Sequence, residues 1–336
     1  MKSASIHPGR RAVMAAIAVA VAAVSASASA QVRAPVADAR MGSSVKSPKP
    51  MRSRLMTSLT GYEVAEYLKR NDVIFVPIGP TEVNGGSPTD VEYVIPLAYA
   101  TKLAEKGDGL VLPYLAYFYP GGTTTSPATV YMSTSDSLPY LKALTRSLIR
   151  QGFRRIIFLT SHGPSGNTML PLVRETFDEL HVPVLWMDTG MITQTPPAGS
   201  NPFAGRPDPF AGGPDARRLV TFGAYEMVGR LDDIPVGLSE PKRSFETDES
   251  DLTRFAPPFN GTPAGTFYAD PSEHGGYVAP ITVEQREEWG KKGAALIASQ
   301  VGAYDVNGML TALRKREEFT STLEKKYGGL LPHAGR

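Results

Sequence analysis

Short apolar runs alternate with helix-patterned segments along this chain, and this alternation constrains the fold more than any other feature. Apolar runs with the length of buried strands occur at residues 73–78, 109–113, 155–160 and 182–187. Segments with apolar residues at helical spacing separate these runs. Strands that alternate with helices favour a mainly parallel sheet with both faces covered. We therefore predict a single-domain α/β fold in which helices sandwich a mainly parallel sheet.

Local signals define the predicted helices. Thr60 and Glu63 have the spacing of a capping box, which is typical of a helix start. Gly152 follows a segment with leucines at helical spacing, and it predicts the end of that helix. The predicted helices cover residues 60–70, 96–106, 135–151 and 168–180.

The N-terminus has the pattern of a secretory signal peptide. A basic start containing Arg10 and Arg11 precedes an apolar stretch over residues 12–24, and an A-x-A cleavage site ends at Ala30. The apolar stretch is shorter than the run of about 18 residues expected of a membrane-spanning helix. We predict that residues 1–30 are removed and that the mature protein is periplasmic or extracellular. Either the general secretory route or the twin-arginine route fits this pattern.

The rest of the chain divides into a leader, one domain and a tail. Residues 31–56 are rich in Pro, Ser, Lys and Arg without an apolar period, which predicts a flexible leader. The predicted domain covers residues 57–320, and residues 321–336 form a C-terminal tail. Residues 193–214 contain many Pro and Gly residues, and we interpret them as an irregular excursion within the domain.

Charge and composition exclude several kinds of partner. The whole chain has a net charge of +2, and the predicted signal peptide holds three basic and no acidic residues. The mature chain would therefore carry a net charge of about −1, which is not typical of proteins that bind nucleic acid or an anionic membrane. The chain has no cysteine, so a metal ion would need His, Asp, Glu or neutral oxygen ligands. Such ligands suit zinc, manganese or iron.

Polar side chains follow two of the predicted strands. Glu82 and Asp90 lie on a Gly-rich loop after the first strand, and His162 follows the strand at 155–160. The carboxyl ends of parallel strands meet at one edge of a sheet, where ligands bind. Two carboxylates and one imidazole there would suit zinc or manganese. Solvated loop acids and a structural histidine remain alternative interpretations.

Two motifs around these residues resemble those of the creatininase (creatinine amidohydrolase) family. The family pattern E-x-H-G-x-H-L-P, followed by T-D, is similar to residues 82–85 and 89–90. Its pattern G-F-R-R-I, followed by H-G-G-N, resembles residues 152–163 and closes at residues 166–167. The resemblance extends over roughly residues 62–293. Weaker similarity lies at residues 126–133, 221–226 and 265–271.

The resemblance implies a creatininase-like fold, a homo-oligomer and a metal site. Its ligands would be Glu82, Asp90 (which bridges two metals in the family), His162 and Glu226. Asn84 and Thr221 stand where the family has histidines. A site that lacks these histidines would hold one divalent ion, zinc or otherwise manganese or iron, or none.

The function that follows is a secreted metal-dependent amidohydrolase that cleaves a non-peptide or cyclic C–N amide bond of a small molecule by metal-activated water. We assign catalytic roles to His162 and Glu226, and substrate contacts to Asn84, Thr124 and His274. Glu226 can also be a helix-surface carboxylate, and His274 a solvated loop histidine. The alternative function is a non-catalytic binding protein with a degenerate metal site, and a third is a hydrolase that uses no metal.

Overall fold

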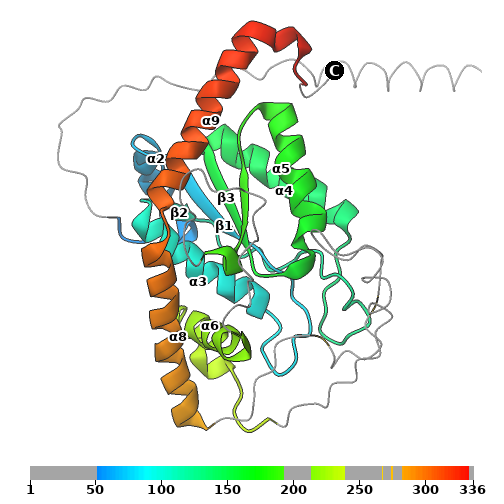
Figure 1. Ribbon diagram of the computed structural model, residues 1–336, viewed down its shortest axis with the longest axis vertical. Helices are drawn as coiled ribbons and strands as arrows, with labels where there is room; N and C mark the ends of the chain where they lie inside the picture. Colours follow the sequence, from blue (N-terminus) through cyan, green and yellow to red (C-terminus); the bar gives the residue numbers. More distant parts are fainter. Residues whose placement is uncertain (1–50, 193–212, 239–266, 268–273, 275–281, 333–336) are drawn as a thin grey trace, which may run out of the picture. The chain divides into compact units, whose positions relative to one another are not determined.

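A four-stranded parallel sheet forms the centre of the computed structural model (Figure 1). Its strands are β1 (Val73–Pro77), β2 (Leu110–Val111), β3 (Arg155–Thr160) and β4 (Leu185–Asp188). They lie in the order β2-β1-β3-β4, and each neighbouring pair is parallel. The predicted α/β class and the mainly parallel sheet are therefore confirmed.

The structure describes residues 51–192, 213–238, 267, 274 and 282–332. The predicted signal peptide, residues 31–50 of the predicted leader and most of the irregular stretch lie outside the described residues. Among those that are described, no helix is both long enough and apolar enough to cross a membrane.

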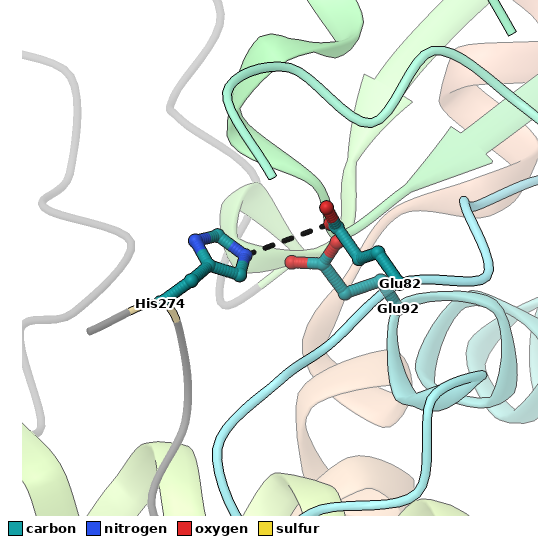
Figure 2. A group of neighbouring side chains, drawn as sticks. All are labelled: Glu82, Glu92 and His274. Atoms are coloured by element: carbon teal, nitrogen blue, oxygen red, sulfur yellow. Dashed lines mark ion pairs between the residues drawn. The ribbon is translucent and has the colours of Figure 1, made fainter. Parts of the chain in front are cut away.

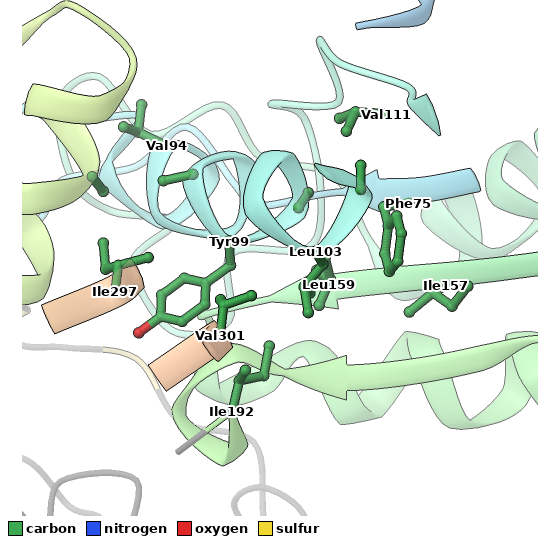
Figure 3. Packing of buried hydrophobic residues seen from close by; sticks show 14 of the residues in the cluster. Phe75, Val94, Tyr99, Leu103, Val111, Ile157, Leu159, Ile192, Ile297 and Val301 are labelled. Atoms are coloured by element: carbon green, nitrogen blue, oxygen red, sulfur yellow. The ribbon is translucent and has the colours of Figure 1, made fainter. Parts of the chain in front are cut away.

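Helices cover both faces of the sheet. Alternate residues of each strand point to opposite faces, so Phe75 and Ile157 belong to one core and Ile74 and Phe158 to the other. The first core, shown in Figure 3, packs against α3 (Val91–Lys106), α6 (Gly213–Met227), α8 (Val283–Ala303) and α9 (Val306–Tyr327). The second packs against α2 (Gly61–Leu68), α4 (Thr134–Gln151) and α5 (Gly166–Leu180). Short 3-10 turns lie at Met56–Ser58, Gly163–Ser165, Thr189–Met191, Leu231–Asp233 and Gly328–Leu330.

Several helix boundaries follow the predicted signals. Thr60 and Glu63 form the reciprocal hydrogen bonds of a capping box at the start of α2. Gly152 ends α4 in the left-handed conformation with a φ of 111°. Helix α3 differs, because it begins at Val91 instead of Pro96. The predicted helix begins at Pro96, but this proline lies inside α3.

The ends of the predicted domain also differ from the described structure. Helix α9 runs through residue 320 to Tyr327, so the predicted start of the tail falls inside a helix. At the other end, Leu55 of the predicted leader forms a parallel bridge with Val111 of β2. The helix at one end and the bridge at the other therefore extend the described domain beyond residues 57–320. The apolar periodicity of the sequence did not mark either extension.

Candidate metal centre

The loop after β1 brings Glu82 against the first turn of α3. A Cβ atom at Gly79 would lie closer than 3.0 Å to the backbone carbonyl of Glu92, so only glycine permits this close approach. The backbone N–H of Glu82 donates to the carbonyl of Thr89 at 3.0 Å, which closes the loop. The Glu82 side chain is fully buried, and the hydroxyl of Thr123 donates to its Oε2 atom.

Glu92 enters the same place from the first turn of α3. Pro96 has no N–H to donate to the Glu92 carbonyl four residues earlier, and the Ser161 hydroxyl donates to that carbonyl at 3.0 Å. The buried Glu92 carboxylate thus lies beside the end of β3. The position of Pro96 and the contact with Ser161 fix where this carboxylate points.

His162 joins the two carboxylates at the end of β3. Its Nδ1 atom lies 2.6 Å from Glu92 Oε2 and 3.2 Å from Glu82 Oε1. The ring is buried, and the ring of Phe118 meets it edge to face at a centroid distance of 6.4 Å. Its Nε2 atom is buried and has no hydrogen-bond partner among the described residues.

His274, far along the chain from Glu82, also lies at this centre, and Figure 2 shows it beside Glu82 and Glu92. Its Nε2 atom lies 3.6 Å from Glu82 Oε1. The backbone N–H of Gly85 donates to the carbonyl of His274 at 3.0 Å, so the loop that carries Glu82 also holds this histidine. We call Glu82, Glu92, His162 and His274 the acid–histidine centre.

Burial and charge act against each other in this centre. Burial favours the neutral form of Glu82, but interactions with His162 and His274 outweigh it and hold the pKa of Glu82 well below its usual range. Burial raises the pKa of Glu92, and His162 offsets only part of this effect. Burial also opposes the charged form of His162, yet Glu92 and Glu82 raise its pKa to about 10. The two carboxylates therefore favour the protonated form of His162 in the metal-free centre.

The donor set fits a divalent metal ion. One ligand atom from each of Glu82, Glu92 and His274 lies within 4.8 Å of the other two. Ligands bound at about 2.0–2.2 Å from one zinc ion are themselves about 3–4 Å apart, so these spacings are close to those of a shared ion. The buried Nε2 atom of His162, which has no hydrogen-bond partner among the described residues, lies in the same cluster. Carboxylate and imidazole are ligands that zinc and manganese accept.

Asp90 lies outside this centre. The hydroxyl of Tyr225 donates to Asp90 Oδ1 at 2.7 Å, and Arg230 forms an ion pair with Oδ2 at 2.6 Å. Arg230 also pairs with Asp233 at 2.6 Å. The two carboxylates that the sequence placed together are thus separated, because the first turn of α3 turns Glu92 toward Glu82 and Asp90 toward α6.

The other predicted site residues have varied positions. Glu226 lies on α6 beside α8, where a Cβ atom at Gly290 would be 3.3 Å from its Oε2 atom, and it is not among the three residues whose ligand atoms cluster. Asn84 is buried, and its carbonyl accepts from Ser87 at 3.0 Å. Thr124 is half-buried, next to the Thr123 that contacts Glu82. Their roles stay predictions.

The sequence patterns gave no ligand role to Glu92 or to Thr123. A carboxylate in the first turn of a helix is common for electrostatic reasons alone, so the pattern gave Glu92 no special weight. Had α3 been predicted to begin before Pro96, Glu92 would have stood at the sheet edge beside His162. Thr123 carries no local signal, because its contact with Glu82 depends on the path of a loop.

One family model matches this chain, over residues 57–206, and it is described as creatininase, creatinine amidohydrolase. Residues 57–206 are therefore similar to the creatininase family. The match includes Glu82, Glu92 and His162, and it ends before His274. The matched region therefore contains the sheet and three of the four residues of the acid–histidine centre.

Two curated proteins are similar to parts of the chain. A 3-dehydro-scyllo-inosose hydrolase from Thermotoga maritima is 29% identical over 108 residues, which is 32% of this chain and 35% of the relative. A creatinine amidohydrolase from Pseudomonas putida is 28% identical over 96 residues, which is 27% of this chain and 37% of the relative. The matched part spans about a third of the length of each relative.

Solved structures of creatininases are also similar to the chain. A crystal structure of creatinine amidohydrolase is 20% identical with a TM-score of 0.47, over 75% of this chain and 98% of that one. A manganese form of creatininase is 18% identical with a TM-score of 0.46, over 82% and 99%. A putative creatinine amidohydrolase from Bacteroides fragilis is 16% identical with a TM-score of 0.46, over 79% and 96%.

Proposed function

We propose that this protein is a secreted, metal-dependent amidohydrolase that cleaves a non-peptide or cyclic C–N amide bond of a small molecule. The observation that carries the proposal is the convergence of Glu82, Glu92 and His274, whose ligand atoms lie within 4.8 Å of one another. They meet beyond the carboxyl ends of parallel strands, where α/β proteins bind ligands. The match of residues 57–206 to the creatininase family model supports the same chemistry.

The proposed ligands of one divalent ion are Glu82, Glu92 and His274, with His162 beside them. Zinc or manganese bound there would polarise a carbonyl and lower the pKa of a bound water. Glu82 and Glu92 would supply negative charge, and Thr123 would hold the Glu82 carboxylate in place through its hydroxyl. Loss of the family histidines at Asn84 and Thr221 is the reason we propose one ion.

His162 is placed to handle protons during amide hydrolysis. The attacking water must lose a proton, and the leaving nitrogen must gain one. The His162–Glu92 pair, 2.6 Å apart, can hold a proton between imidazole and carboxylate. The buried Nε2 atom of His162 has no partner among the described residues, so this nitrogen is available to a ligand or a substrate.

Export and substrate contacts belong to the same proposal. Export is supported by the signal-peptide pattern of residues 1–30. Asn84 and Thr124 lie on the two loops next to Glu82 and Thr123, and we propose that they contact the substrate. Zinc and manganese both occur in the names of creatininase structures similar to this chain.

The proposal is tested with mature protein purified without chelators. Hydrolysis of a panel of small linear and cyclic amides is measured as isolated, after treatment with a chelator, and after reloading with zinc or manganese. We expect activity that is lost on chelation and restored by one ion per chain. Chelator-resistant hydrolysis would contradict the metal mechanism. Absence of both metal and hydrolysis after reloading would favour a non-catalytic binding protein.

A further inference from the structure

A long segment without charge borders the acid–histidine centre. Residues 113–133 contain no Asp, Glu, Lys, Arg or His, but include four tyrosines, one phenylalanine and several Thr and Ser residues. Residues 83–89, on the loop that follows Glu82, are also uncharged. Two uncharged loops thus flank a buried centre that is itself highly charged.

Direct contacts fix the 113–133 segment to the loop of Glu82. Val130 donates its backbone N–H to the carbonyl of Thr81 at 2.9 Å, and the hydroxyl of Thr129 accepts from the backbone N–H of Val83 at 3.3 Å. The hydroxyl of Thr81 donates to the carbonyl of Ala116 at 2.7 Å. These bonds lie on both sides of Glu82 in the sequence, so the segment runs directly beside this carboxylate.

The same segment reaches into the centre and also faces solvent. Thr123 and Phe118 are buried against Glu82 and His162. Tyr131, next to the Val130 that pairs with Thr81, is 52% exposed. Tyr119, next to the buried Phe118 and Pro120, is half-buried. Burial raises the pKa of Tyr119, and Tyr131 acts in the same direction. Aromatic surface therefore leads from solvent toward the buried carboxylates.

Arg230, a cation that follows α6, is already neutralised. Arg230 pairs with Asp90 and Asp233, both at 2.6 Å. The uncharged loops offer no opposite charge to a carboxylate, a phosphate or an ammonium group on a substrate. Exposed tyrosine faces favour stacking with a flat or apolar ring face, and threonine hydroxyls favour neutral polar groups.

We propose that the 113–133 segment is the substrate-recognition wall of this centre, and that the substrate carries a neutral ring next to its scissile amide. This inference rests on the proposed function. Tyr131 and Tyr119 stack on the ring, while the amide enters toward Glu82 and Glu92. An aromatic ring and the apolar face of a sugar ring share this stacking chemistry.

Binding of four small probes to the metal-loaded protein tests the proposal. Acetanilide carries a neutral aromatic ring, N-acetylglucosamine a neutral sugar ring, 4-acetamidobenzoate an anionic ring, and N-methylacetamide no ring. Dissociation constants are measured by ligand-observed NMR for the wild type, Tyr131→Ala and Tyr131→Phe. Tyr62→Ala is the matched control, because Tyr62 is 88% exposed and lies on α2.

We expect Tyr131→Ala to weaken binding of the better neutral ring about tenfold, or about 1.4 kcal/mol. Tyr131→Phe keeps the ring face and should stay within about twofold of the wild type, as should Tyr62→Ala. N-methylacetamide should bind equally to all forms. The tighter of acetanilide and N-acetylglucosamine identifies an aromatic or a sugar ring.

The inference would be overturned if 4-acetamidobenzoate bound as tightly as acetanilide or more tightly. It would also be overturned if the neutral rings bound Tyr131→Ala as tightly as the wild type. Failure of both neutral rings to bind would also overturn it. The assay needs no turnover, so it separates this inference from the proposed function. Ring binding that depends on Tyr131, without hydrolysis of any amide, would keep the recognition wall and reject the hydrolase.

Discussion

Replacement of Glu92 by glutamine should remove most of the metal affinity, whereas replacement of Asp90 by asparagine should not. Both changes replace a carboxylate by an amide of the same size, and the two residues are separated by a single position. Glu92 lies in the acid–histidine centre, 2.6 Å from His162. Asp90 pairs with Arg230 and Tyr225. The two variants therefore distinguish the ligand indicated by the structure, Glu92, from the ligand implied by the family pattern, Asp90.

The expected loss follows from the charge removed. Two unit charges about 4 Å apart interact by about 4 kcal/mol at an effective dielectric constant of about 20, and a divalent ion doubles this energy. Dehydration of the ion and the remaining amide oxygen of glutamine offset part of it. We expect Glu92→Gln to raise the metal dissociation constant by about 100- to 1000-fold, or about 3–4 kcal/mol.

The Asp90→Asn variant should differ from the wild type by less than about twofold in metal affinity. Arg230 is 41% exposed and keeps Asp233 as a partner, so the expected loss of folding stability is about 0–1 kcal/mol. Dissociation constants are measured by competition with a fluorescent chelator at one fixed pH. If Asp90→Asn lost the metal while Glu92→Gln kept it, the assignment of Glu92 would be refuted.

Three further predictions concern backbone contacts and pH. A Cβ atom at Gly79 would lie closer than 3.0 Å to the backbone of the first turn of α3, so Gly79→Ala should lower both folding stability and metal affinity. Gly61 has open space around it, so Gly61→Ala should change neither quantity. Denaturant titration measures the stability of both variants, and chelator competition measures their metal affinity. Gly293→Ala should destabilise the contact of α8 with α6 by about 1–3 kcal/mol, since its Cβ would also lie closer than 3.0 Å to backbone. Gly302→Ala, on the same helix in open space, should be neutral or stabilise by up to about 1 kcal/mol, and equal effects would contradict the packing. In the metal-free protein the pKa of His162 is raised from 6.5 to about 10. The contribution of protonated His162 to folding stability is therefore complete below about pH 6.5 and is lost as pH rises toward 10. The unfolding free energies of the wild type and His162→Asn should converge over this pH interval.

The fold was predictable because its signals are local. The apolar runs at 73–78 and 155–160 became β1 and β3, and the capping box at Thr60 begins α2. Each signal depends on residues within a few positions of one another, and burial in a parallel sheet requires the apolar composition seen here. The creatininase resemblance agrees with the family match over residues 57–206.

The site was less predictable because small errors in helix position redirect side chains. Because α3 begins at Val91, Glu92 contacts His162 while Asp90 contacts Arg230. The predicted helix began only at Pro96, so it did not include Glu92. The contact between His274 and Glu82 joins residues nearly two hundred positions apart through a backbone bond to Gly85. No local pattern encodes such a contact, although His274 was singled out as a substrate contact.

The most direct test of the account is the position of the bound ion in crystals of the metal-loaded protein. Anomalous difference maps recorded on both sides of the zinc or manganese absorption edge locate that element among the side chains. We predict one peak per chain, within about 2.0–2.3 Å of ligand atoms from Glu82, Glu92 and His274. A peak at Asp90, or no peak after loading, would contradict the assignment of a metal centre to these three residues.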